Sequence, residues 1–181
     1  MISHHSSRLG RLRGGLLLGL LLGLGTLRVA AQTSSTATPT MSAVLTDIIS
    51  LNATISTAQL VFDNAAKYNN GTSTTVTNQF NITSNKAYTL TVRASGDLSN
   101  GQATPITIPV SSVSLAANWA LGLTGSIAAL STTAQALTSS GPATQQQNIS
   151  TTYTVSAANA ANFLRPAGTY TTTLTFTATQ N

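Results

Sequence analysis

The chain has 181 residues, of which 41% are hydrophobic and only 6% are charged, and it contains three acidic residues and no cysteine. Without cysteine there is no disulfide, no thiolate nucleophile and no cysteine-based zinc site. Both histidines, His4 and His5, lie at the start of the chain, so the remainder lacks the usual general base near neutral pH.

The first stretch of the chain is typical of a secretory signal peptide. Residues 1–13 carry three arginines and no acid, and Gly14–Leu27 consists almost entirely of leucine and glycine. Small residues follow at Val29-Ala30-Ala31, as before a cleavage site. The apolar run is shorter than the ~20 residues that cross a bilayer. We therefore predict a signal peptide over residues 1–31, no membrane span after cleavage, and a secreted, periplasmic or cell-surface location; the alternative is an uncleaved anchor.

Cleavage after Ala31 changes the charge of the chain, which is +5 over the whole sequence. Residues 32–181 keep four basic and three acidic residues, a net charge of +1. These are Lys67, Lys86, Arg93, Arg165, Asp47, Asp63 and Asp97. No basic stripe remains to neutralise phosphates, so nucleic acid is not an expected partner.

The three aspartates are the only carboxylate side chains available for catalysis, because the chain contains no glutamate. Each stands among loop-like residues, in Thr46-Asp47-Ile48, Phe62-Asp63-Asn64 and Gly96-Asp97-Leu98. The sequence also shows nothing that would activate a serine or threonine nucleophile. We therefore predict a protein that is not an enzyme, with no catalytic, cofactor-binding or metal-binding residue; a hydrolase that uses aspartate is the minor alternative.

After the signal peptide the chain changes from a linker to strands. Residues 32–42 are rich in Ser, Thr and Ala, which predicts a flexible lead-in. Apolar residues then recur with a period of two over Leu45–Ile55 and predict a first strand. A second, short strand is predicted at Leu60–Phe62, and Lys67–Thr72 is predicted to be a loop with a turn at Asn70-Gly71.

The clearest strand pattern lies on both sides of a short polar segment, Ser84–Lys86. Thr75–Thr83 and Tyr88–Ser95 each alternate between larger or apolar residues and polar ones, with Gln79 and Arg93 in the polar rows. Two such runs joined by a short polar loop predict an antiparallel hairpin.

The middle of the chain gives weaker signals. Ser95–Ala103 and Ser139–Gln147 are predicted to be loops, and Ile106–Val110 a strand that Pro109 restricts to a sheet edge. Gly125–Thr138 has too little periodicity for an assignment.

The last part of the chain again alternates. Ile149–Val155 predicts a strand, and Ala157–Leu164 one or two helical turns. From Tyr170 to Ala178 the larger side chains fall on every second position and threonine fills the rest, which predicts a long strand with one buried and one exposed face. Roughly seven to nine short strands predict an all-β fold, a single antiparallel immunoglobulin-like β-sandwich over residues 43–181.

The turn Gly168-Thr169-Tyr170 and the alternating run that follows it resemble the end of bacterial pilin-type domains, namely chaperone–usher fimbrial subunits and the related spore coat protein U-type domains. The block Phe80–Val92, F-N-I-T-S-N-K-A-Y-T-L-T-V, is similar too. The resemblance implies a pilin-like β-sandwich. The chain departs from these families in having no disulfide and in placing Gln180 next to last, where fimbrial subunits commonly have an aromatic residue; it does not imply assembly by a chaperone.

These features predict a secreted, non-catalytic structural or adhesive bacterial surface protein, with a fimbria-like subunit as the most specific form. The alternative is a secreted carbohydrate-binding module, for which Trp119 and Tyr68 are the candidate stacking residues. Tyr88 and Tyr153 lie in apolar rows and are expected in the core. A single tryptophan among leucines is also more typical of a core position than of a sugar platform.

The expected partners are other surface or fimbrial subunits, bound by strand pairing, or extracellular glycans. An exposed sheet edge can accept a strand, because it presents unpaired N–H and C=O groups. Gln32–Ile55 has the features of a donor strand: a Ser/Thr/Pro tether followed by alternating apolar residues. The favoured alternative is that this segment pairs within its own domain.

Overall fold

The structure is a computed structural model that describes residues 34–181. The predicted signal peptide, residues 1–31, lies outside the described residues. One compact unit spans Ala43–Asn181. Within the described part of the chain, no helix is both long enough and apolar enough to cross a membrane.

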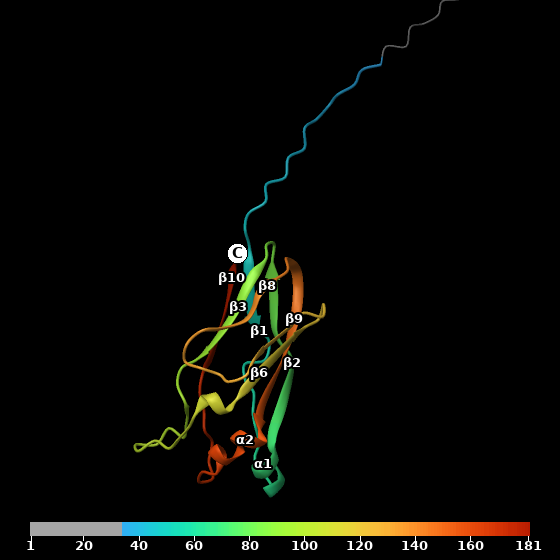
Figure 1. Ribbon diagram of the computed structural model, residues 1–181. Coiled ribbons are helices and arrows are strands. Elements are labelled where there is room, and N and C mark those ends of the chain that lie inside the picture. The colour runs from blue at the N-terminus through green and yellow to red at the C-terminus, as the bar shows by residue number, and fades with distance from the viewer. Residues whose placement is uncertain (1–33) are drawn as a thin grey trace, which may run out of the picture. The chain divides into compact units, whose positions relative to one another are not determined.

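Short strands make up most of this unit, and two short α-helices and two 3-10 helices lie between them (Figure 1). In chain order the elements are β1 (Ile49–Ala53), α1 (Ala65–Asn70), β2 (Gly71–Ser84), β3 (Tyr88–Ala94), β4 (Leu98–Ser99), β5 (Thr107–Ile108), η1 (Val110–Ser112), β6 (Ser114–Trp119), β7 (Thr124–Ile127), β8 (Gln135–Gly141), β9 (Thr144–Ser156), α2 (Ala157–Ala160), η2 (Ala161–Phe163) and β10 (Leu174–Gln180).

The strands form two main sheets. A five-stranded sheet has the order β1-β2-β9-β6-β7, a three-stranded sheet has the order β10-β3-β8, and β4 pairs with β5. Every pairing among these strands is antiparallel. The predicted all-β, antiparallel sandwich-like fold is therefore confirmed. At one end of the sandwich, α1 and α2 lie side by side (Figure 1).

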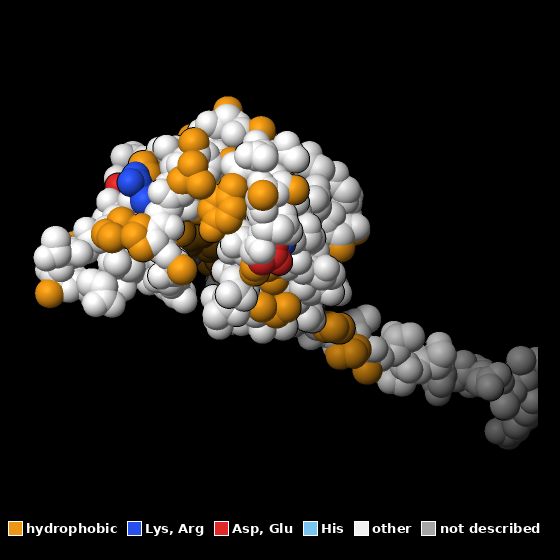
Figure 2. All heavy atoms as spheres, turned by 90° about the horizontal axis from the view of Figure 1, so that it is seen from below, with side chains coloured by type: hydrophobic (Ala, Val, Ile, Leu, Met, Phe, Trp, Pro, Cys, Tyr) orange, Lys and Arg blue, Asp and Glu red, His pale blue; other side chains and the backbone are white. Residues whose placement is uncertain are grey.

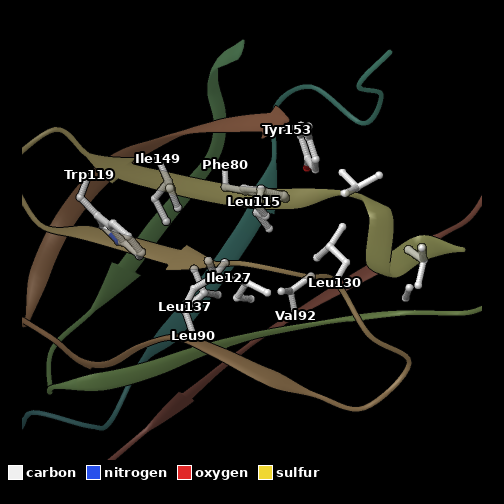
Figure 3. Packing of buried hydrophobic residues seen from close by; sticks show 14 of the residues in the cluster. Phe80, Leu90, Val92, Leu115, Trp119, Ile127, Leu130, Leu137, Ile149 and Tyr153 are labelled. Atoms are coloured by element: carbon white, nitrogen blue, oxygen red, sulfur yellow. The ribbon is translucent and has the colours of Figure 1, made fainter. Parts of the chain in front are cut away.

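The core lies between the two sheets and receives the inward rows of both. Leu90 and Val92 of β3 meet Leu115 of β6 and Ile149 of β9, and each of these side chains is at most 1% exposed (Figure 3). Burying a side chain of this size stabilises the fold by about 1.5–3 kcal/mol. The period-two pattern of the sequence thus reflects burial between sheets.

The predicted hairpin of β2 and β3 is wrong, although the bounds of both strands are close to the prediction. β2 pairs with β1 and β9, whereas β3 pairs with β10 and β8. The connecting loop crosses from one sheet to the other, and Asn85 in that loop bonds to the chain before β1. Its Nδ2 donates to the carbonyl of Thr46 over 2.8 Å, and its Oδ1 accepts from the amide of Ile48 over 3.0 Å.

The segment between β1 and β2 also differs from the prediction. Leu60–Phe62 forms no strand, and Phe62 packs against the rings of Tyr68 and Phe163. The predicted loop at Lys67–Thr72 is mostly helix α1. Asn64 caps this helix by accepting from the amide of Lys67 over 3.1 Å, and Gly71 ends it with a φ of 79°.

Two predicted loops contain strand residues. Ser95–Ala103 includes β4, and most of Ser139–Gln147 belongs to β8 and β9. The predicted strand at Ile106–Val110 is shortened to β5, and Pro109 precedes the helix η1. The unassigned region Gly125–Thr138 supplies residues to β7 and β8. The predicted helical turns at Ala157–Leu164 are confirmed as α2 and η2.

The predicted first and last strands are both shorter in the structure. β1 covers only Ile49–Ala53 of the expected Leu45–Ile55. β10 begins at Leu174, and its inward row is only half-buried where the sequence predicts a buried face. This incomplete burial of β10 marks the open side of the sandwich.

Candidate binding groove

Trp119, one of the two predicted binding residues, lies in the core. Its side chain packs among the buried hydrophobic residues (Figure 3) and is 3% exposed. Its Nε1 donates to the hydroxyl of Tyr88 over 2.8 Å. No face of the indole is open to a ligand, so the structure contradicts a platform role for Trp119. Tyr88 and Tyr153 are also buried, as their apolar rows predict.

We expect the substitution Trp119→Phe to lower the free energy of unfolding by about 2 kcal/mol, because it removes buried ring volume and the donor to Tyr88. Denaturant unfolding measures the loss. Tyr88→Phe removes the acceptor of the same bond, and the double variant completes a thermodynamic cycle. A coupling energy near zero would show that the bond contributes nothing.

A groove of about 730 Å³ opens on the β10 side of the sandwich. This volume lies within the range of ordinary ligand sites. Seen from the end that carries the helices, a hollow ringed by hydrophobic side chains marks this region (Figure 2). Most of its lining comes from three parts of the chain: residues 53–62, buried core residues, and residues 165–176.

The groove exists because both sheets end early on this side. β1 stops at Ala53, opposite Phe80, and the amides of Thr54 and Ile55 then both donate to the carbonyl of Gln79 as the chain leaves the sheet. From there toward Gly71, β2 pairs only with β9. β10 pairs only with β3. Two unpaired sheet edges therefore border the same groove.

The half-buried inward row of β10 forms one wall. Leu174 and Phe176 line the groove and pack against the core without being covered by it. The ring centroids of Phe80 and Phe176 lie 4.4 Å apart, which joins the wall to the floor.

Aromatic side chains gather at the mouth of the groove, where α1 and η2 meet. Phe62 stacks on Phe163 with ring centroids 4.6 Å apart, and it contacts Tyr68 at 5.2 Å. Tyr68, the second predicted binding residue, therefore lines the groove. Arg165 is the one charged side chain among the described residues of the lining.

Sequence reasoning missed Gln79, which it placed in the outward row of β2. An irregularity in the pairing of β2 with β9 falls between Val76 and Phe80, and within it Asn78 has a φ of 53°. This β-bulge turns two successive side chains inward. Gln79 is therefore 4% exposed, beside Phe80 at 6%, and both lie in the groove lining.

Two hydroxyl groups hold the side chain of Gln79 on the groove floor. Its Oε1 accepts from the hydroxyl of Thr151 and, over 3.0 Å, from that of Tyr153. Burial raises the pKa of the Tyr153 phenol, and its hydrogen bonds with Thr151 and Gln79 offset part of that effect. The groove thus has a neutral polar cluster on its floor and apolar side chains along its walls.

The raised pKa of Tyr153 predicts that the protein loses stability in alkali. The unfolded phenol ionises near pH 10 and the folded one at higher pH, so this contribution is fully present below about pH 10 and is lost as the pH rises through the folded pKa. Urea midpoints between pH 8 and 12 measure the effect. Tyr153→Phe is expected to flatten the decline; equal slopes for the two proteins would contradict this assignment.

The three aspartates take part in separate local contacts. Asp47 pairs with Lys86 at 2.6 Å, Asp63 pairs with Lys67 at 2.9 Å, and Asp97 accepts from a backbone amide at the start of η1. The hydrogen bond from Lys67 lowers the pKa of Asp63. No group of three or more potential metal ligands occurs within residues 34–181.

Fold and groove together define a class of protein, namely an antiparallel β-sandwich with an open groove along one side. No protein-family model and no characterised protein sequence matches the chain.

Proposed function

We propose that this protein is a secreted, non-catalytic structural or adhesive bacterial surface protein, which associates with further copies by strand pairing in the groove. The observation that carries the proposal is the half-buried inward row of β10 beside two unpaired sheet edges. An incoming strand would cover that row and bond to an edge, which is how exposed edges acquire partners.

A donor segment lies ahead of the folded domain. From Thr36 to Ala43 the sequence T-A-T-P-T-M-S-A alternates between polar and apolar residues, Val44 and Leu45 follow, and the whole segment is exposed. Met41 is 94% and Leu45 83% exposed. The later part of the predicted donor, Ile49–Ala53, is already paired with β2 in its own domain, so the donor we propose is limited to residues 34–45.

The positions of donor and groove favour a fibre over a closed dimer. β2 runs from α1, at the groove mouth, to the loop that holds Thr46 and Ile48 at its other end. The donor therefore leaves its domain at the end opposite the mouth. Such a head-to-tail contact is heterologous, and repetition without closure gives an open filament.

Two substitutions in the exposed donor test the proposal without touching the core. The mature chain, residues 32–181, is expected to form oligomers whose size grows with concentration in sedimentation velocity. Met41→Asp places a charge in the apolar row and is expected to leave a monomer. Thr40→Asp, in the polar row, is the matched control and is expected to assemble. A mature chain that stays monomeric at high concentration would refute the proposal.

A carbohydrate-binding module is the second candidate, supported by the position of Tyr68 in the aromatic mouth of the groove. A glycan array with the mature chain and its Tyr68→Ala variant separates the two functions. Loss of glycan binding in a folded variant would favour the module, and absence of binding by both proteins would leave assembly as the function.

A further inference from the structure

The buried amide of Gln79 is an unusual group to find on the floor of an apolar groove. Its Oε1 accepts from two hydroxyl groups, and no hydrogen bond joins its Nε2 to another described residue. We infer that Gln79 selects the strand that enters the groove, by requiring a hydrogen-bond acceptor on the residue that faces it. This inference rests on the proposed strand pairing and names its specificity-determining residue.

The backbone around Gln79 is held in a conformation that the sheet alone does not favour. A positive φ is uncommon for a residue other than glycine, and Asn78 adopts one at 53°. Neighbouring bonds stabilise it: the amide of Asn78 donates to Ser150 Oγ over 2.9 Å, and the carbonyl of Gln79 accepts from Thr54 and Ile55. Strained bulges are frequent where a side chain must be aimed at a ligand.

The fixed amide discriminates between strands by desolvation. The hydroxyls of Thr151 and Tyr153 donate to Oε1, and Gln79 lines the groove while its Nε2 bonds to no described residue. A wholly apolar strand would remove the Nε2 group of Gln79 from water without giving it a hydrogen-bond acceptor, which makes binding less favourable. A strand with an acceptor at that point would satisfy it.

The donor segment has one polar residue at the end of its apolar row. Ser35, Ala37, Pro39, Met41, Ala43 and Leu45 share a face by their period of two. Gln79 lies at the inner end of the groove, next to Phe80, where β1 begins to cover the core. A strand that enters with Ser35 innermost brings its Oγ to Gln79 and leaves the apolar residues along the walls toward the mouth.

Peptide binding to a monomeric receptor tests this pairing. The receptor is the mature chain with Met41→Asp, and the ligand is a synthetic peptide of residues 34–45. Ser35→Ala in the peptide is expected to weaken binding about tenfold, whereas Ser34→Ala, on the opposite face, is expected to leave it unchanged. Gln79→Met in the receptor is expected to abolish the difference between the unmodified peptide and its Ser35→Ala form.

A control separates the loss of the Gln79 Nε2 group from a general change in the structure of the groove floor. Tyr153→Phe removes one of the bonds to Gln79 but keeps its Nε2, so the preference for serine is expected to remain. If the Ser35→Ala change in the peptide lowers its binding affinity equally for the receptor that keeps Gln79 and for the Gln79→Met receptor, that result would overturn the inference while leaving strand pairing in place. A peptide that binds neither receptor, together with a monomeric mature chain, would overturn both.

Discussion

Replacing Gly71 with alanine is expected to lower the free energy of unfolding by about 3–5 kcal/mol, a large part of the ~5–15 kcal/mol typical of a domain. Gly71 has a φ of 79°, where an L side chain is strained, and its amide caps α1 by donating to the carbonyl of Lys67. An added methyl group would also overlap the backbone of Val155. Urea unfolding measures the loss.

Two other glycines separate the causes of this loss. Gly101 has a φ of 67° but open space around it, so Gly101→Ala is expected to cost only the backbone strain, about 1 kcal/mol. Gly96 has neither the positive φ nor a close neighbour, and Gly96→Ala is expected to change stability by less than about 0.5 kcal/mol. If Gly71→Ala lowers the free energy of unfolding no more than Gly101→Ala does, then β2 and β9 can move apart at little cost to accommodate the methyl group.

The strand content of the fold could be predicted from the sequence because burial imposes a period of two on each strand. Which strands pair with each other could not be predicted in this way. β2 and β3 alternate as the strands of a hairpin do, but both have inward rows that must be buried, and facing each other across a core buries them equally well. The structure pairs β2 with β1 and β9, and β3 with β10 and β8, and most of these partners are distant in sequence.

The candidate site was harder to predict than the fold. Tyr68 was named as a candidate stacking residue and lines the groove, whereas Trp119, the other candidate, lies in the core, as is more typical of a single tryptophan among leucines. Gln79 escaped prediction because a single residue, Asn78, reverses the alternation of β2. Asparagine tolerates a positive φ better than most residues, and its presence is the one local signal of a bulge at that point.

Gly141→Ala is expected to lower the free energy of unfolding by about 2–3 kcal/mol without any backbone strain. Gly141 lies opposite Tyr88 where β8 pairs with β3, and a methyl group added to it would overlap the Tyr88 ring. That ring is fully buried, and its hydroxyl is bonded to Trp119, so it cannot swing away without breaking a core contact. Overpacking of this kind typically costs about 1–3 kcal/mol.

A second substitution tests whether the tyrosine ring is the cause. Tyr88→Leu removes the ring, at a cost of its own, and leaves room for a methyl group on residue 141. Adding Gly141→Ala to Tyr88→Leu is therefore expected to cost much less than adding it to the wild-type protein, a coupling of about 1–2 kcal/mol in a double-mutant cycle. Strictly additive losses would mean that the methyl group meets some other neighbour, because contact with the ring alone predicts that each change reduces the effect of the other.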